Sequence, residues 1–407
     1  MYSNFLQTSI KEVLDTLIAK QAFKTERVLA GPQGPQVRLG DRDFLMLASN
    51  NYLGLAANPE IVATAGKILK EWGLGMSSVR FIAGTTELHQ ELEKKLADFL
   101  GTESAMLFSS CFSANEAFFA ALINEGFGQS SYQDAVYSDE LNHASIIDAL
   151  RLVKKEVLVK RLYPHGDLAE LEKMLAGDKS KNFRFKIIAT DGVFSMEGET
   201  APLEKLLKLT DQYQALLFVD DSHGVGVLGK TGRGTPEQLG VFGKIDVLSG
   251  TLGKALGGAL GGYLAGSEKI IEFLRQKARP YIFSNSLPPV IVGATLAALQ
   301  LLEDNPALLK SLNDNTKYFR DKIKALGFSI IDGEHPIVPV MLKETALTQK
   351  MSQALLAEGL YVVGLWYPVV PEGQARLRVQ ISASHTQEHL DKALAIFAKV
   401  GKQLKII

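Results

Sequence analysis

A single lysine, Lys254, lies in a glycine-rich stretch that runs from Ser249 to Gly258, directly after an apolar run that ends at Leu248. Glycine neighbours let the backbone approach a ligand closely. A lysine in a confined, partly dry site can lose its proton and form a Schiff base with a carbonyl. Thr251, three residues earlier, can offer a hydroxyl and a backbone N–H to a phosphate. A glycine-rich turn with a solvated lysine remains the alternative explanation for this stretch alone.

The same stretch does not fit a nucleotide-binding phosphate loop. That motif requires G-x-x-x-x-G-K followed by Ser or Thr, because the hydroxyl binds magnesium. The position five before Gly253 is Leu248, and Ala255 follows the lysine. Two required positions are therefore missing, and nucleotide binding is not predicted here.

A second stretch, Ala215 to Gly224, has the pattern of a buried strand that ends in an acid and an imidazole, Asp220 and His223. Ligands of open α/β sheets bind beyond the carboxyl ends of parallel strands. Lys254 follows Asp220 by 34 positions, at the end of the next expected strand. This pair suits pyridoxal phosphate, because the carboxylate keeps the pyridine nitrogen protonated while the lysine holds the aldehyde.

Three motifs together carry a family resemblance: V-D-D-S-H-G-V-G, T-D-G-V-F-S-M-E-G and S-G-T-L-G-K-A-L-G-G. The chain resembles the α-oxoamine synthases, a group of fold-type I pyridoxal-phosphate enzymes, from about Phe44 to its C-terminus. The resemblance implies an α/β fold in which a large domain with a mostly parallel seven-stranded sheet carries a smaller C-terminal α+β domain. It also implies a homodimer with active sites at the subunit interface.

The activity that the resemblance implies is an acyl transfer without decarboxylation. Glycine condenses with acetyl-CoA to give 2-amino-3-ketobutyrate and coenzyme A, and the reverse cleavage serves threonine breakdown. Two alternatives remain open. The first is a related synthase that joins another amino acid to a longer acyl group, for example alanine to a pimeloyl thioester. One or two side chains can admit the longer acyl group, because each methylene contributes only about 1–3 kcal/mol of discrimination. The second alternative is a protein that binds the cofactor without catalysis.

The resemblance also gives roles to single residues. Lys254 holds the cofactor and moves the α-proton, Asp220 faces the ring nitrogen, and His223 lies against the phenolic oxygen. His143 stacks on the ring and is available for proton transfer. The other implied cofactor contacts are Cys111, Phe112, Ser195, Thr251 and, from the second subunit, Ser284. The implied substrate contacts are Asn50, Ser195 and Arg378.

Several of these residues also have a plainer explanation. Cys111 begins a helix, where a cysteine can be an activated nucleophile, although no base stands near it in the sequence. His143 can be a helix cap and Ser195 a turn residue. Ser113 stands where the family usually carries an acid, and the segment Gly126–Asp134 is longer than the family pattern. The sequence explains neither of the last two features.

Two further constellations are set aside. Asp221-Ser222-His223 is not a hydrolase triad, because adjacent residues diverge at a strand end and no G-x-S-x-G occurs. His385 and His389 have a metal-like spacing, but Ser384-x-x-Gln387 is typical of a capping box at a surface helix. No metal is predicted.

Composition bounds the class of protein. The 407 residues carry a net charge of −1 and 22% charged side chains, so no basic field indicates nucleic acid or an anionic membrane. Cys111 is the single cysteine, which suits a reducing compartment. No signal-like N-terminus and no apolar run of about 18 residues occurs. We expect a cytoplasmic protein without nucleic-acid or membrane partners.

Hydrophobic periodicity predicts the elements that position these residues. The amphipathic stretch Met1–Lys20 predicts a helix. The predicted strands of the main sheet are Ala105–Phe108, Ala135–Ser138, Lys186–Thr190, Leu216–Asp220, Val247–Ser249 and Gly262–Ala265, and the predicted helices cover 60–72, 87–99, 114–123, 143–152, 168–175 and 203–213. An irregular loop, Pro280–Pro289, precedes a helical region at 290–326 and strands at Phe328–Ile331 and Ile337–Leu342. The domains are expected at 46–289 and 290–407, after an N-terminal helix and arm at 1–45.

Overall fold

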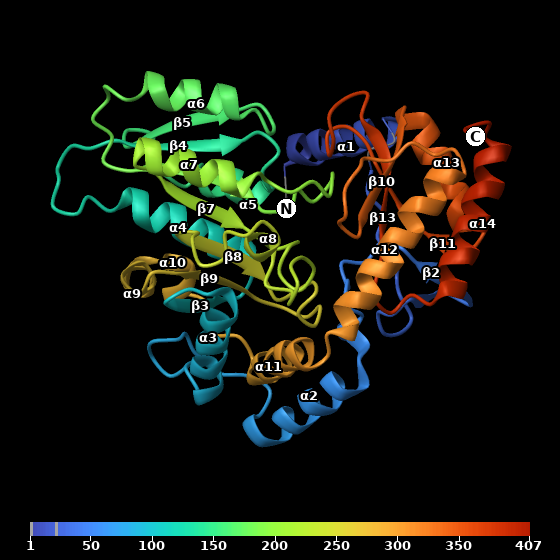
Figure 1. Cartoon of the computed structure of the whole chain (residues 1–407), viewed down its shortest axis with the longest axis horizontal. Helices are drawn as coiled ribbons and strands as arrows, with labels where there is room; N and C mark the ends of the chain where they lie inside the picture. The colour runs from blue at the N-terminus through green and yellow to red at the C-terminus, as the bar shows by residue number, and fades with distance from the viewer. Residues whose placement is uncertain (1–2, 21–22) are drawn as a thin grey trace.

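The computed structural model describes residues 3–20 and 23–407. Its largest sheet has seven strands in the order β3-β9-β8-β7-β6-β4-β5, and β9 runs antiparallel to both of its neighbours (Figure 1). The other pairings in this sheet are parallel. The strands are β3 (Ser104–Phe108), β4 (Asp134–Asp139), β5 (Leu158–Tyr163), β6 (Lys186–Asp191), β7 (Leu216–Asp220), β8 (Val247–Thr251) and β9 (Gly262–Gly266).

Helices cover both faces of this sheet, which is why its strands are continuous apolar runs rather than alternating ones. Along β7, Leu217 and Val219 join one core while Phe218 joins the other. The first core is covered by α3 (Glu87–Leu100), α6 (Leu168–Gly177), α7 (Leu203–Tyr213) and α11 (Pro289–Asp304). The second is covered by α4 (Cys111–Asn124), α5 (Ala144–Ala149), α9 (Glu268–Lys277) and α10 (Arg279–Ile282).

The C-terminal part forms a separate core around an antiparallel sheet in the order β10-β13-β12. Its elements are α12 (Ala307–Ala325), β10 (Ile337–Lys343), α13 (Thr345–Ala357), β12 (Val363–Leu365), β13 (Ala375–Gln380) and α14 (Gln387–Gln403). A third small sheet joins β1 (Gln36–Leu39) and β2 (Arg42–Met46) to β11 (Leu360–Tyr361), so the N-terminal arm pairs with this C-terminal part. The division at 46 and 290 stays a prediction.

The remaining helices are η1 (Leu55–Ala57), α2 (Pro59–Trp72) and α8 (Thr235–Gln238). The helix α2 packs against α11 beside the main sheet (Figure 1). Among the residues that the structure describes, none of the helices combines the length and the apolar character that a membrane crossing requires.

Two of the predicted elements differ from the structure. The stretch Phe328–Ile331 is not a strand, because it pairs with β10 only through an isolated bridge between Ile330 and Val340. The helical region at 290–326 is two helices, which are separated at Pro306. The strand β5 was not among the predicted strands; it lies at the sheet edge, where Lys160 and Arg161 interrupt the apolar pattern.

The segment Gly126–Asp134, which the sequence leaves unexplained, wraps around a single arginine. The Nε atom of Arg184 donates to Asp134 at 3.0 Å, and its guanidinium lies 3.9 Å from the centre of the Tyr132 ring. The Tyr132 hydroxyl in turn donates to the carbonyl of Ile123 at 3.1 Å. The segment is therefore anchored to the main sheet by stacking and an ion pair.

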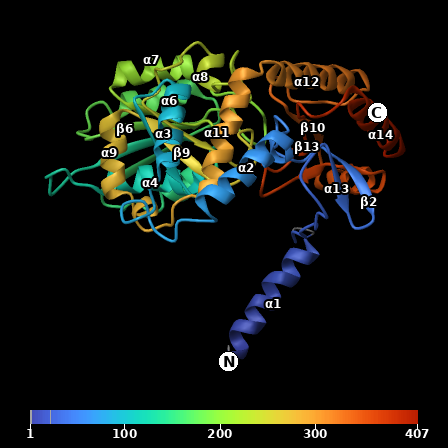
Figure 2. The ribbon, with the colours of Figure 1, turned by 90° about the horizontal axis from the view of Figure 1, so that it is seen from below.

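The first helix, α1 (Asn4–Ala19), has no buried side chain among its residues. Ser3 caps it, and it extends away from the rest of the molecule (Figure 2). Its exposed apolar side chains are Phe5, Leu6, Ile10, Val13, Leu14, Leu17 and Ile18. Residues 1 and 2 of the predicted helix lie outside the described residues. This helix therefore presents an apolar stripe that none of the other described residues buries.

Candidate active site

A cavity of about 190 Å³ lies at the carboxyl ends of the parallel strands. Because these strands end at one edge of the sheet, the polar residues that follow them gather there. The cavity is lined by Ser110, Cys111, Phe112, His143, Ser145, Asp191, Val193, Asp220, Ser222, His223, Thr251 and Lys254. Seven of the residues predicted from the sequence are thus brought together around one space.

Lys254, which follows β8, reaches the imidazole of His223. Its Nζ atom lies 2.8 Å from His223 Nε2, and the Nδ1 atom of the same ring lies 2.8 Å from the hydroxyl of Tyr52. Burial lowers the pKa of Lys254, although the carboxylate of Asp220 opposes this effect. Burial holds the pKa of His223 well below its usual value, so this imidazole is neutral.

Asp220, the last residue of β7, is only 5% exposed. Its Oδ2 atom accepts from Asn115 Nδ2 at 2.7 Å and its Oδ1 atom from the backbone N–H of Ser222 at 3.1 Å. No ion pair to this carboxylate occurs within the described part of the chain. A buried charge without a counter-charge is costly. The base of the cavity is therefore suited to a cationic group such as a protonated pyridine nitrogen.

The N-terminus of α4 forms another wall of the cavity. The Ser110 hydroxyl accepts from the backbone N–H of Ser113 at 3.1 Å, which leaves the first-turn N–H groups of Cys111 and Phe112 without a partner inside the helix. Such a helix start is suited to a phosphate. Gly262 of β9 crosses this turn so closely that a Cβ there would lie 2.2 Å from the Cys111 nitrogen.

Thr251 ends β8 beside this wall. Its hydroxyl accepts from the backbone N–H of Gly253 at 3.0 Å and donates to the carbonyl of Gly261 at 3.2 Å. A lysine, an unpaired buried carboxylate and a helix start thus surround one cavity. These residues fit the aldehyde, the ring nitrogen and the phosphate that the sequence leads us to expect.

Cys111 does not have the environment of a nucleophile. Burial, reinforced by the negative charge of Asp220, raises the pKa of its thiol well above the usual value. The sulfur accepts from the Ser222 hydroxyl at 3.3 Å and lies 3.6 Å from Asp220 Oδ2. The thiol therefore stays protonated, and Cys111 lines the cavity without acting as a nucleophile.

His143 is the N-cap of α5, which is the plainer of its two predicted roles. Its Nδ1 atom lies 2.7 Å from the Ser145 hydroxyl, and its backbone N–H donates to Asp191 Oδ1 at 3.1 Å. The ring also lines the cavity, with Phe112 edge-on at 6.4 Å between ring centres. Capping fixes the ring in the cavity wall, and stacking on a cofactor stays a prediction.

Arg378, Asn50 and Ser195 meet in a second cluster, which we call the carboxylate clamp together with Gln380. The Nε atom of Arg378 donates to the carbonyl of Ser195 at 2.6 Å, and Nη2 lies 3.5 Å from Asn50 Oδ1. Gln380 also donates to Asn50 Oδ1. In contrast, Arg376 is 3% exposed and pairs with Glu197 at 3.0 Å. Arg378 thus keeps donors for a ligand, while Arg376 is structural.

Ser284 does not line the cavity of its own chain. It lies in the loop after α10, in a small pocket that also includes Arg80 and Tyr281. Its predicted contact crosses to a second subunit, and that contact stays a prediction.

Four residues that support the site have no role among the sequence-based predictions. Asn115 follows Cys111 by one helical turn, a spacing that signals a shared face. Asp191 ends β6 as Asp220 ends β7, which is a second usable signal. Tyr52 and His335 have no such signal. His335 Nε2 lies 2.9 Å from the carbonyl of His223, and its Nδ1 accepts from the backbone N–H of Ile337 at 3.0 Å.

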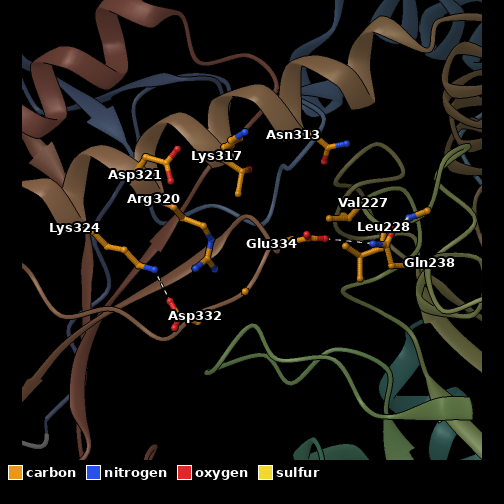
Figure 3. A pocket seen from close by; sticks show the side chains of 13 residues that line it. Val227, Leu228, Gln238, Asn313, Lys317, Arg320, Asp321, Lys324, Asp332 and Glu334 are labelled. Atoms are coloured by element: carbon orange, nitrogen blue, oxygen red, sulfur yellow. Dashed lines mark hydrogen bonds and ion pairs between the residues drawn. The ribbon is translucent and has the colours of Figure 1, made fainter.

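A larger cavity of about 470 Å³ lies between α12 and the chain after Val227 (Figure 3). Four of its charged side chains, those of Arg320, Lys324, Asp332 and Glu334, have partners within the chain. Lys324 pairs with Asp332, and Arg320 donates to carbonyls of the loop that precedes β10 and to that of Ile337, the first residue of β10. None of the predicted site residues lines this cavity, so the reactive groups, rather than the volume, identify the active site.

Known proteins resemble this chain in sequence and in fold. The profile of the family described as Aminotransferase class I and II matches residues 42–397. A 2-amino-3-ketobutyrate coenzyme A ligase of Escherichia coli is 46% identical over 97% of both chains. An 8-amino-7-oxononanoate synthase of Thermoanaerobacter pseudethanolicus is 43% identical over 98% of both. A solved serine palmitoyltransferase from S. paucimobilis, with bound PLP–myriocin aldimine, superposes with a TM-score of 0.90 and 28% identity over the full length of both.

Proposed function

The chain belongs to the aminotransferase class I and II family, and on that premise we propose that it is a pyridoxal-phosphate-dependent acyltransferase. Its reaction joins glycine to acetyl-CoA and gives 2-amino-3-ketobutyrate and coenzyme A. The observation that carries this proposal is the buried carboxylate of Asp220, which lines the same cavity as Lys254 and has no ion-pair partner among the described residues. The 46% identity to a 2-amino-3-ketobutyrate coenzyme A ligase, over 97% of both chains, supports the choice of substrates.

Eight residues would hold the cofactor: Lys254, Asp220, His223, His143, Cys111, Phe112, Thr251 and Ser195. When bound, pyridoxal phosphate supplies an aldehyde that amino groups can join and a protonated ring that withdraws electrons from the substrate α-carbon. Asp220 keeps the positive charge at the base of the cavity. The Nζ atom of Lys254, whose pKa burial has lowered, removes the α-proton of glycine.

The carboxylate clamp orients glycine for this proton removal. An arginine binds a carboxylate with two parallel hydrogen bonds, which fixes the α-C–H bond relative to the lysine. Asn50 adds an amide to the same group. His223 and His143 complete the walls of the cavity, since both residues line it.

Replacing Arg378 with lysine is expected to raise KM for glycine by roughly 10- to 100-fold with a smaller change in kcat, because a point charge replaces a bidentate fork. Steady-state kinetics with glycine as the varied substrate measures this. The matched control is Arg376→Lys on the same strand, which should weaken the Glu197 pair and the thermal stability but leave KM for glycine near the wild-type value. Equal increases in KM for both variants would contradict the clamp.

The amino acid and acyl group are tested by coenzyme A release from acetyl-CoA and from longer acyl-CoA thioesters, each with glycine, alanine or serine. We expect the highest kcat/KM with glycine and acetyl-CoA. Preference for alanine with a long acyl donor would instead support the second candidate, which the synthase relative at 43% identity favours. If glycine left the visible absorption of the bound cofactor unchanged, the chain would be a binding protein without catalysis.

We further propose that the chain acts as a homodimer in which Ser284 contacts the cofactor phosphate of the other subunit. The uncovered apolar stripe of α1 supports an interface with a second copy, as do the exposed side chains of Phe81, Ile82 and Phe283 in loops near Ser284. A cytoplasmic location is proposed as well, because a single buried cysteine is typical of a reducing compartment.

A further inference from the structure

The hydroxyl of Tyr52 lies where the cavity and the carboxylate clamp meet. Tyr52 is completely buried, and its oxygen lies 2.8 Å from His223 Nδ1, 3.4 Å from Gln380 Nε2 and 3.5 Å from Asn50 Oδ1. Burial raises the pKa of this phenol, so it keeps its single proton. The question is which neighbour accepts that proton.

Geometry and donor inventory leave one acceptor. Gln380 Nε2 is itself a donor and takes a lone pair of the Tyr52 oxygen. Asn50 Oδ1 lies at the limit of hydrogen-bond distance from that oxygen, and it already accepts from Gln380 and Arg378. His223 Nδ1, at 2.8 Å, is therefore the acceptor.

The direction of this hydrogen bond fixes the remaining proton of the imidazole. A neutral imidazole that accepts at Nδ1 carries its proton on Nε2. Nε2 lies 2.8 Å from Lys254 Nζ, so the lysine must accept this bond with a lone pair, as a neutral amine.

His335 holds the backbone of His223 from the other side. The backbone N–H of Ile337 donates to His335 Nδ1, which places the His335 proton on Nε2, where it donates to the carbonyl of His223 at 2.9 Å. Burial lowers the pKa of His335 to about 3, so this imidazole is also neutral. Backbone and ring of His223 are thus held by two separate residues.

We propose that Tyr52 is a positioning residue that fixes His223 as the Nε2–H tautomer and thereby links the carboxylate clamp to the proton state of Lys254. The titratable and charged groups that face His223 or Lys254 are Tyr52, His143, His335, Arg378, Asp220, Asp191 and Cys111. Of these, Tyr52 is the group bonded to His223 Nδ1. The inference rests on the proposed function only in taking a glycine carboxylate as the ligand of the clamp.

A pH titration of the visible absorption of the cofactor-loaded enzyme tests this proposal. In Tyr52→Phe, the His223 proton is free to move to Nδ1, so Nε2 offers an acceptor to the Lys254 nitrogen. We expect the apparent pKa of the absorption change to rise by about one unit, a tenfold change in proton affinity. Acetate, a carboxylate without an amine, should shift the wild-type titration but not that of the variant.

The matched control is Tyr137→Phe. That tyrosine is also buried, and its hydroxyl bonds Asp178 at 2.9 Å without touching His223. The control should titrate like wild type and respond to acetate, even if it is less stable. A Tyr52→Phe titration indistinguishable from wild type, with its acetate response intact, would overturn the proposal.

Nitrogen-15 NMR of ring-labelled histidine decides the tautomer without depending on the variant. The His223 signals are assigned by their loss in His223→Gln. In the wild-type protein we expect an unprotonated Nδ1 and a protonated Nε2, and a protonated Nδ1 would overturn the inference even if Tyr52→Phe failed to fold. Absence of coenzyme A release would contradict the proposed function and leave this spectrum unchanged, so the two failures are distinguishable.

Discussion

Replacing Lys254 with alanine is expected to lower the rate of coenzyme A release from glycine and acetyl-CoA by on the order of 10⁴-fold. The variant loses both the amine that joins the cofactor and the base that moves the α-proton. It should also lose the covalent link between protein and cofactor that borohydride reduction makes permanent in the wild-type enzyme. Steady-state kinetics and the intact mass after reduction measure the two effects separately.

The matched control for this variant is Lys244→Ala, an exposed lysine just before β8 that does not line the cavity. It should retain wild-type turnover and the reduced cofactor adduct. A Lys254→Ala enzyme with normal turnover would contradict the assignment of the catalytic base. An adduct that persisted in that variant would place the covalent link on another lysine.

The second large effect is expected for Asp220→Asn, with kcat lower by about 10² to 10³-fold. The amide has the shape of the carboxylate but removes the buried negative charge that stabilises a cation in the cavity. Both oxygens of the Asp220 carboxylate accept hydrogen bonds, from Asn115 and from the backbone N–H of Ser222. The NH₂ group of an asparagine would therefore face one of these two donors. Single-turnover kinetics separates this loss from weaker cofactor binding.

The adjacent residue supplies the control for Asp220→Asn. Asp221 is equally buried, but its carboxylate bonds the hydroxyl and the backbone N–H of Thr235. Burial raises its pKa to about 7, so its neutral form is well populated near neutral pH and an amide imitates it closely. Asp221→Asn should therefore change kcat little. Equal losses in both variants would show that packing, rather than the charge of Asp220, sustains turnover.

Much of the cavity was predictable because its residues follow strands. Asp220 and Lys254 stand at the ends of apolar runs, and parallel strands bring such ends to one edge. The edge strand β5 was missed because its outer side faces solvent and its pattern is interrupted by charge. The predicted strand Phe328–Ile331 is apolar enough for the assignment, but it makes a single bridge. Local pattern thus predicts buried central strands better than edges.

Contacts between segments that are distant along the chain could not be predicted from the sequence. Tyr52 and His335 reach His223 across 171 and 112 positions, and no local spacing encodes either contact. A capping detail was also wrong: α14 begins after Thr386, whose capping-box partner is His389, rather than at Ser384 with Gln387. Helix capping explains His389. His385, the other histidine of the metal-like spacing that was set aside, bonds the carbonyl of Met46.

The clamp contact between Arg378 and Asn50 spans 328 positions, which has a consequence for synthesis on the ribosome. Chains emerge at about 5–20 residues per second, N-terminal parts first. The strands that carry Asp220 and Lys254 are therefore exposed well before β13, and a nascent chain holds a reactive lysine before it has a substrate clamp. Long-range pairing of this kind folds late. During translation, the residues that would bind the cofactor are thus synthesised before the substrate clamp is complete.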